Sequence, residues 1–202
     1  MHLPLIRPAR HAAGFTFVEV LVAIVIAAFA GSSLLLGICS SLQNTNDGMR
    51  QTMTLGMAQQ LLDEIVGDRY LDYGANPYPT TLGPSPAKVS GVSRQLFTEI
   101  GDFNGYQSSP PVDPWGIPLG TEDGQGGTRH PNFVISPNLL SGWQQQVSVY
   151  YVGGTNFTTP LPAGQTSDYL AVDVKILFLD PQRGPLVWAE VRRVISYVAP
   201  LQ

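Results

Sequence analysis

One carboxylate, Glu19, stands at the start of a long apolar run and is the residue best placed for charge chemistry. No charged residue follows it before Asp47, and residues 20–36 are almost wholly apolar. About 20 apolar residues are enough for a helix to cross a bilayer. An ionised side chain at the edge of the hydrocarbon is unfavourable and usually has a function. Glu19 is therefore the first candidate functional residue, at the start of a predicted membrane-spanning helix over residues 15–42.

No other residues form a recognisable catalytic pattern. His130 is a lone histidine in a loop, and Cys39, the only cysteine, has no basic neighbour to activate it. The chain contains no Gly-x-Ser-x-Gly, phosphate-loop or His-Glu-x-x-His motif. Oxygen ligands for calcium occur in the loops without the spacing of an EF-hand, so solvated turns are the favoured interpretation of Asp102, Asn104, Asp113, Glu122 and Asp123. We expect no enzyme, no cofactor and no metal site.

Three interpretations compete for the N-terminal segment. A cleaved signal peptide would use Arg7, Arg10 and His11 as its basic region and Ala28-Phe29-Ala30 as its cleavage site. A plain transmembrane anchor would need only the apolar run. Neither a signal peptide nor a plain anchor requires a carboxylate at position 19, and this favours the third interpretation. A lipoprotein site at Cys39 is disfavoured because Ile38 is too bulky for the residue before the cysteine.

The third interpretation comes from the order of residues 14–19: Gly14, aromatic Phe15, Thr16, apolar Phe17 and Val18, then Glu19. With the basic leader before it and the apolar run after it, this order resembles the class III prepilin signature of the type IV pilin and pseudopilin family. The resemblance covers about residues 7–40, and Phe17 departs from the leucine that is usual in the family.

The resemblance implies a leader over residues 1–14 and cleavage between Gly14 and Phe15 by a prepilin peptidase. It also implies N-methylation of Phe15 and an assembly role for Glu19. Cleavage would leave a cationic amine on Phe15, one helical turn from the Glu19 carboxylate. The pair could form within one subunit or between neighbours, since buried charges are favourable only when matched.

The chain is thus expected to be a minor pilin or pseudopilin of a type II secretion or type IV pilus filament. Its partners would be the prepilin peptidase, other pilin or pseudopilin subunits and the bacterial inner membrane. Arg7 and Arg10 place the N-terminus in the cytoplasm and the domain after the single span in the periplasm. No nucleic acid partner is expected, because the formal net charge is −4.

Residues 16–67 are predicted to form one helix, whose amphipathic part continues over 43–67. Its apolar side chains recur at i+4 and are flanked by Leu62 and Val66, which indicates a face packed on a sheet. The members of this stripe are Met49, Met53, Met57, Leu61 and Ile65.

Residues 68–132 are rich in proline and glycine and are predicted to be loops, with surface turns at 102–106 and 109–113. Residues 133–202 are predicted to form an antiparallel sheet, and 43–202 one soluble domain. The expected strands are 133–135, 146–152, 169–179 and 186–198, the last two forming a hairpin. Alternation falters at Arg192-Arg193, which indicates a bulge or an edge. The predicted fold class is α+β, with the long N-terminal helix packed on the sheet.

Two alternative functions remain at this point. The first is a membrane-anchored or secreted binding module that presents aromatic loop residues, and exposure of those residues would favour it. They are Tyr70, Tyr73, Tyr78, Phe103, Tyr106 and Trp115. The second, less favoured, is a tethered enzyme, which would require converging acids in a cleft.

Overall fold

The computed structural model describes residues 14, 16–136 and 138–199. It divides into two compact units, Met1–Gly48 and Met49–Gln202. Helix α1 (Phe17–Gly67) supplies the regular structure of the first unit and ends in the second. The helix predicted over residues 16–67 is confirmed. The predictions for leader residues 1–13 and for Phe15 concern positions outside the described residues.

The part of α1 in the first unit is apolar and exposed over its described length. Its hydroxyl side chains bond to the backbone one turn earlier: Ser32 Oγ donates to Ala28 O at 2.8 Å, and Ser33 Oγ to Phe29 O at 2.9 Å. Bonds of this kind satisfy hydroxyl groups without any partner outside the helix. By length and composition α1 can cross a membrane.

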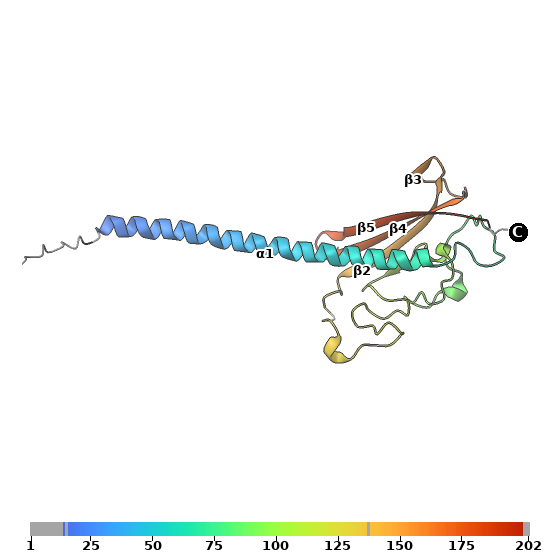
Figure 1. Ribbon diagram of the computed structural model, residues 1–202, viewed down its shortest axis with the longest axis horizontal. Helices are drawn as coiled ribbons and strands as arrows, with labels where there is room; N and C mark the ends of the chain where they lie inside the picture. Colours follow the sequence, from blue (N-terminus) through green and yellow to red (C-terminus); the bar gives the residue numbers. More distant parts are fainter. Residues whose placement is uncertain (1–13, 15, 137, 200–202) are drawn as a thin grey trace, which may run out of the picture. The chain divides into compact units, whose positions relative to one another are not determined.

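The second unit is built on an antiparallel sheet that the end of α1 covers (Figure 1). In chain order, its strands are β1 (Gln107–Ser108), β2 (Trp143–Gly153), β3 (Asn156–Pro160), β4 (Tyr169–Asp180) and β5 (Gly184–Ser196). The strand order is β1-β2-β4-β5, and β3 pairs with β2 beside this path. The predicted α+β fold, a long helix on a small antiparallel sheet, is confirmed.

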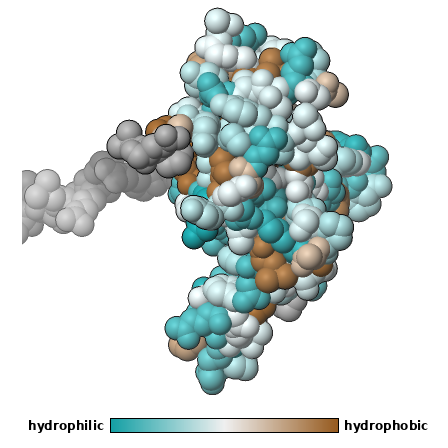
Figure 2. Space-filling model, turned by 90° about the vertical axis from the view of Figure 1, so that its right-hand side faces the viewer, coloured by the Kyte–Doolittle hydropathy of each residue, from teal (hydrophilic) through white to brown (hydrophobic). Residues whose placement is uncertain are grey.

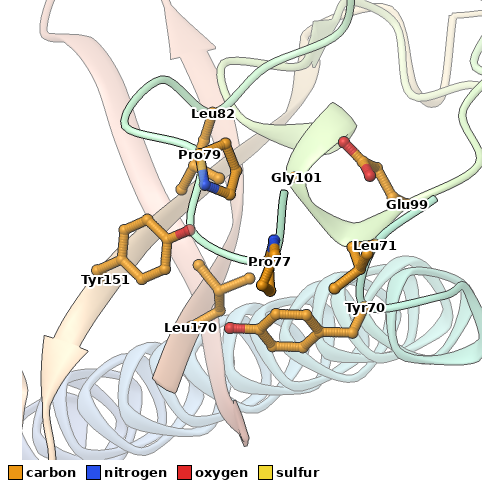
Figure 3. Close-up of a pocket in the computed structure, with 9 residues that line it drawn as sticks. All are labelled: Tyr70, Leu71, Pro77, Pro79, Leu82, Glu99, Gly101, Tyr151 and Leu170. Atoms are coloured by element: carbon orange, nitrogen blue, oxygen red, sulfur yellow. The ribbon is translucent and has the colours of Figure 1, made fainter. Parts of the chain in front are cut away.

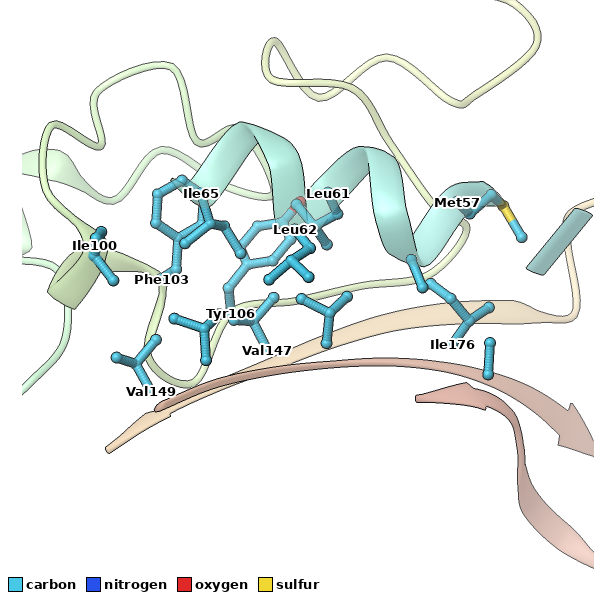
Figure 4. Packing of buried hydrophobic residues seen from close by; sticks show 14 of the residues in the cluster. Met57, Leu61, Leu62, Ile65, Ile100, Phe103, Tyr106, Val147, Val149 and Ile176 are labelled. Carbon is cyan, nitrogen blue, oxygen red and sulfur yellow. The ribbon is translucent and has the colours of Figure 1, made fainter. Parts of the chain in front are cut away.

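The core lies between α1 and this sheet, and Figure 4 shows side chains from both layers pointing toward one another. Ile65 and Val147 are fully buried, and Leu61 is 1% exposed. Burying each such side chain contributes about 1.5–3 kcal/mol. The predicted stripe is wrong at its first member, because Met49 is 68% exposed and contact with the core begins at Met53.

The strand predictions over 146–152, 169–179 and 186–198 correspond to β2, β4 and β5. The strand predicted over 133–135 is wrong. Pro131 begins a short 3₁₀-helix, η3 (Pro131–Phe133), and the Val134 amide donates back to Pro131 O instead of joining a sheet. Proline favours the first turn of a helix because its φ is already fixed and it lacks an N–H.

The faltering pattern at Arg192-Arg193 marks an edge rather than a bulge. Both arginines pair in register with β4, and β5 is the last strand of the sheet path. The register shift lies between Ile176 and Leu177, opposite Trp188. An edge strand is solvated along one side, so strict alternation is not required there.

The turns predicted at the surface over 102–106 and 109–113 are largely buried. Residues 100–103 form the 3₁₀-helix η2 (Ile100–Phe103), in which Phe103 is 1% exposed and Asp102 2%. Phe103 fills the core beside α1 and stacks edge-on against Phe97 at 5.1 Å. Asp102 is tolerated because it accepts from Lys88 Nζ at 2.6 Å.

Candidate functional site

The first turn of α1 is closed by a reciprocal pair of hydrogen bonds between Thr16 and Glu19. The Thr16 amide donates to Glu19 Oε2 at 2.9 Å, and Thr16 Oγ1 donates to the same oxygen at 3.0 Å. In return the Glu19 amide donates to Thr16 Oγ1 at 3.3 Å. This is a capping box, which satisfies amides that the helix itself leaves unpaired. The Thr-x-x-Glu spacing signals it in the sequence, and the sequence interpretation above missed it.

The capping box fixes where the Glu19 carboxylate lies. It faces the N-terminal end of α1, where the helix dipole is positive and favours a negative charge. The Thr16 amide that it binds is the one joined covalently to Phe15. The side chain is exposed, and no partner other than Thr16 contacts it among residues 14, 16–136 and 138–199. The carboxylate is thus held close to the chain position at which a new amine would appear after cleavage.

Gly14 lies outside the helix and is exposed, with no neighbouring atom within 4 Å of the position a Cβ would take. Two residues separate it from the start of α1 at Phe17. Phe15 itself lies outside the described residues. The predicted cleavage position therefore falls in chain that precedes the capped helix, and the cleavage itself remains a prediction.

Beyond Glu19 the helix presents an uncharged surface as far as Asn46. Large apolar side chains on it are exposed, for example Phe29 at 72% and Leu36 at 71%. Cys39 is a free thiol exposed on the same stretch. Such a surface is unfavourable in water and favourable in lipid or against other apolar helices.

The loop acids act as local hydrogen-bond acceptors. Asp113 Oδ1 accepts from the amides of Trp115 and Ile117, and Asp123 Oδ1 from those of Gln125 and Gly127. Among the described residues no three His, Cys, Asp or Glu side chains gather as metal ligands would. His130 is exposed, and its Nδ1 accepts from the Asn132 amide.

The aromatic loop residues divide into two groups. Phe103 and Tyr106 are buried in the core, so they cannot present their rings to a ligand. Tyr73 is fully exposed, and Tyr78 and Trp115 are partly exposed. A binding function is therefore compatible with the structure, and two of the three exposed rings, Tyr73 and Tyr78, lie in the segment that follows α1.

Tyr70 is half-buried and so belongs to neither the buried nor the exposed group. Its hydroxyl and that of Tyr151 point into one small cavity lined also by Pro77 and Leu170 (Figure 3). Neither hydroxyl has a hydrogen-bond partner in the described chain. Burial is the main cause that raises the pKa of both phenols, so both stay neutral.

The cationic side chain of Arg94 has a structural role in the second unit. Arg94 is 4% exposed and binds both carboxylate oxygens of Glu64 on α1, at 2.6 and 2.7 Å. Burial acts to lower the pKa of Arg94, but the bonds and charge of Glu64 raise it above its usual value. Arg94 is therefore not available to a ligand.

Comparison with known proteins identifies the N-terminal segment. Residues 9–35 match the family model of the prokaryotic N-terminal methylation motif, which is the type IV pilin and pseudopilin signature. No curated protein and no solved structure matches the chain. The match covers the capping box, Glu19 and most of the uncharged helix surface. The signature expected from residues 14–19 is confirmed.

Proposed function

We propose that this pilin-type chain is the precursor of a minor pilin or pseudopilin subunit of a type II secretion or type IV pilus filament. The observation that carries the proposal is the methylation motif placed on a capped, uncharged, exposed helix with Glu19 in its first turn. A motif of this type indicates a structural, non-enzymatic subunit.

Processing would occur between Gly14 and Phe15, catalysed by a prepilin peptidase, with N-methylation of Phe15. The exposure of Gly14 and its position ahead of the helix support this step, because a peptidase needs access to an extended backbone. The basic leader residues Arg7 and Arg10 favour a cytoplasmic N-terminus. The domain that follows the single span would then lie in the periplasm before assembly.

Assembly would use the apolar surface of α1 for packing and Glu19 for register. The capping box holds the carboxylate at the helix end, near the amine that cleavage would leave on Phe15. An unmatched charge is strongly disfavoured in apolar surroundings. The filament would therefore favour a packing arrangement in which Glu19 pairs with the amine of Phe15, either in the same subunit or in a neighbour. Ala27, Ala28 and Gly31 allow neighbouring helices to approach closely.

The test separates the charge of Glu19 from its capping bond. Glu19→Gln keeps an oxygen that can accept from the Thr16 amide, as capping boxes with Gln do, but removes the charge. Glu19→Ala removes both. We expect both variants to be processed as the wild type is and to be depleted from purified filaments. Asp47→Asn, which neutralises a carboxylate farther along the same helix, is the matched control and should assemble normally.

Two results would contradict the proposed role. Normal incorporation of Glu19→Gln beside failure of Glu19→Ala would show that the cap, and not the charge, matters for assembly. Normal incorporation of both would remove Glu19 from assembly altogether. Immunoblots of sheared filaments and of membranes give the incorporated and the total protein from the same culture.

A further inference from the structure

The segment that follows α1 and the segment that follows β5 together form an open groove of about 360 Å³. We call it the tyrosine groove and define it by Tyr70, Asp72, Tyr73, Tyr197 and Val198, which are among the residues that line it. Tyr73 is fully exposed and Val198 is 79% exposed. It lies entirely within the second unit, and the filament proposal does not use it.

Two rings of the groove, those of Tyr70 and Tyr197, are held in place by each other and by Tyr78, whereas Tyr73 is exposed and has no ring contact among the described residues. Tyr70 and Tyr197 have ring centroids 5.3 Å apart, and Tyr78 packs edge-on against Tyr197 at 6.0 Å. Tyr78 is fixed in turn, because its hydroxyl donates to Asp168 Oδ1 at 2.7 Å. Preorganised tyrosines lose little entropy on binding and are frequent hot spots of protein interfaces.

The surroundings of the groove are acidic. Its lining includes the carboxylate of Asp72 and no lysine or arginine. Asp72 Oδ2 binds Lys88, and Arg69 is a second cation nearby: hydrogen bonds from Lys88 and Thr98, with the charges of Lys88 and Arg69, lower the pKa of Asp72. Asp102 binds the same Lys88 ammonium group and Asp168 binds Tyr78, so these three carboxylates exceed the two cations by one charge. The field at the groove therefore attracts cations and repels anions.

The face of the second unit that Figure 2 shows carries small, separate hydrophobic patches among polar atoms. A partner that needs one broad apolar face would not find it here. Tyrosine rings with nearby carboxylates suit a different chemistry, since a lysine or arginine placed over an aromatic face is attracted to the ring and to the negative charge.

We propose that the tyrosine groove binds a lysine- or arginine-bearing segment of a partner protein, with the cation over the exposed face of Tyr73 and balanced by Asp72 and Asp168. Tyr197 and Val198 would contact the aliphatic stem of the same side chain. This inference goes beyond filament assembly, so either proposal can fail while the other holds.

The test uses the full chain in detergent micelles and a fluorescein-labelled peptide of alternating Gly and Arg. Fluorescence anisotropy gives the dissociation constant at low and at high salt. We expect binding that weakens with salt and that Tyr73→Ala weakens by about two- to fivefold, the range for one exposed cation–π contact. Tyr73→Phe keeps the ring and should bind like the wild type. Asp168→Asn keeps an acceptor for Tyr78 and should weaken binding while reducing its salt dependence.

Phe133→Ala is the matched control, because Phe133 is an aromatic residue 73% exposed that does not line the groove. It should leave the dissociation constant unchanged. Equal binding of a Gly-Glu peptide, or no effect of Tyr73→Ala, would overturn the proposal. Tyr73-dependent binding of a neutral oligosaccharide with no binding of the Gly-Arg peptide would assign the groove to sugars instead. Binding of the peptide only after deletion of residues 200–202 would assign it to the chain's own C-terminus.

Discussion

Replacing Arg94 should destabilise the second unit more than replacing any surface cation. The guanidinium group binds Glu64 through two nitrogens and donates to Tyr106 Oη, Val112 O and Asp113 O, each at 3.0 Å. It thereby joins α1 to the loops. Arg94→Ala leaves a partly buried carboxylate unpaired and removes the Arg94 donor from Val112 O, while Asp113 O keeps the Gly116 amide as a donor.

The size of this effect follows from the burial of the pair. The Arg94 side chain is 2% exposed and that of Glu64 25%. Breaking a buried ion pair by removing one partner costs about 3–5 kcal/mol. For a domain of this size each kcal/mol lowers Tm by about 2–4 °C, so the expected fall is roughly 6–20 °C. The Tm of Arg94→Lys should lie between those of the wild type and Arg94→Ala. An ammonium group can pair with Glu64, but it cannot also reach the hydroxyl and carbonyl oxygens that the guanidinium group binds.

Thermal unfolding of the full chain in detergent measures this effect. Fluorescence of Trp143, which is 3% exposed in the core, reports on the second unit. Arg129→Ala is the matched control, because Arg129 is 47% exposed in its pair with Glu122 and a surface pair contributes only about 0–1 kcal/mol. A fall for Arg94→Ala no larger than that for Arg129→Ala would refute the assignment of Arg94 as a buried connection between α1 and the loops.

Two further predictions concern the sheet and the helix stripe. Burial acts to raise the pKa of Asp173, but hydrogen bonds from Arg192 and Tyr150 lower it below its usual value. The stability that Asp173 contributes is therefore present above about pH 4 and is lost as the pH falls through the lowered folded-state pKa. Urea midpoints of the wild type and Asp173→Asn should differ at neutral pH and converge in strong acid; a constant difference would contradict this. Ile65→Ala should cost about 2–5 kcal/mol and Met49→Ala at most about 0.5 kcal/mol in the same unfolding assay, and equal effects would place Met49 in the core.

Local periodicity was sufficient to predict the main elements. Every second residue from Leu170 to Ile176 is apolar, and the structure places Leu170, Val172, Val174 and Ile176 in the core as period 2 requires. The charge-free run after Glu19 likewise predicted the helix. These signals are strong because many residues of one helix or strand follow the same pattern, so a single exception does not hide it.

The failures arose where a distant partner decides the outcome. Phe103 lies among turn residues, so nothing local shows that α1 and the sheet leave a space for its ring. Arg94 lies in the segment predicted to be loops, and its partner Glu64 is 30 residues away, so no local pattern indicates the pair. Turn chemistry misled at 133–135, where Pro131 starts a 3₁₀-helix before a short apolar sequence. The capping box could have been found from Thr16 and Glu19 alone.

The most direct test of the central claim is the mass of the N-terminal peptide of the protein isolated from membranes. Pilin-type processing predicts a chain that begins at N-methylated Phe15, directly ahead of the capping box that holds Glu19. A chain that begins at Gly31 would have lost both Glu19 and the motif, as a signal peptide does. That result would contradict the filament account and leave a secreted domain whose function has to be sought in the tyrosine groove.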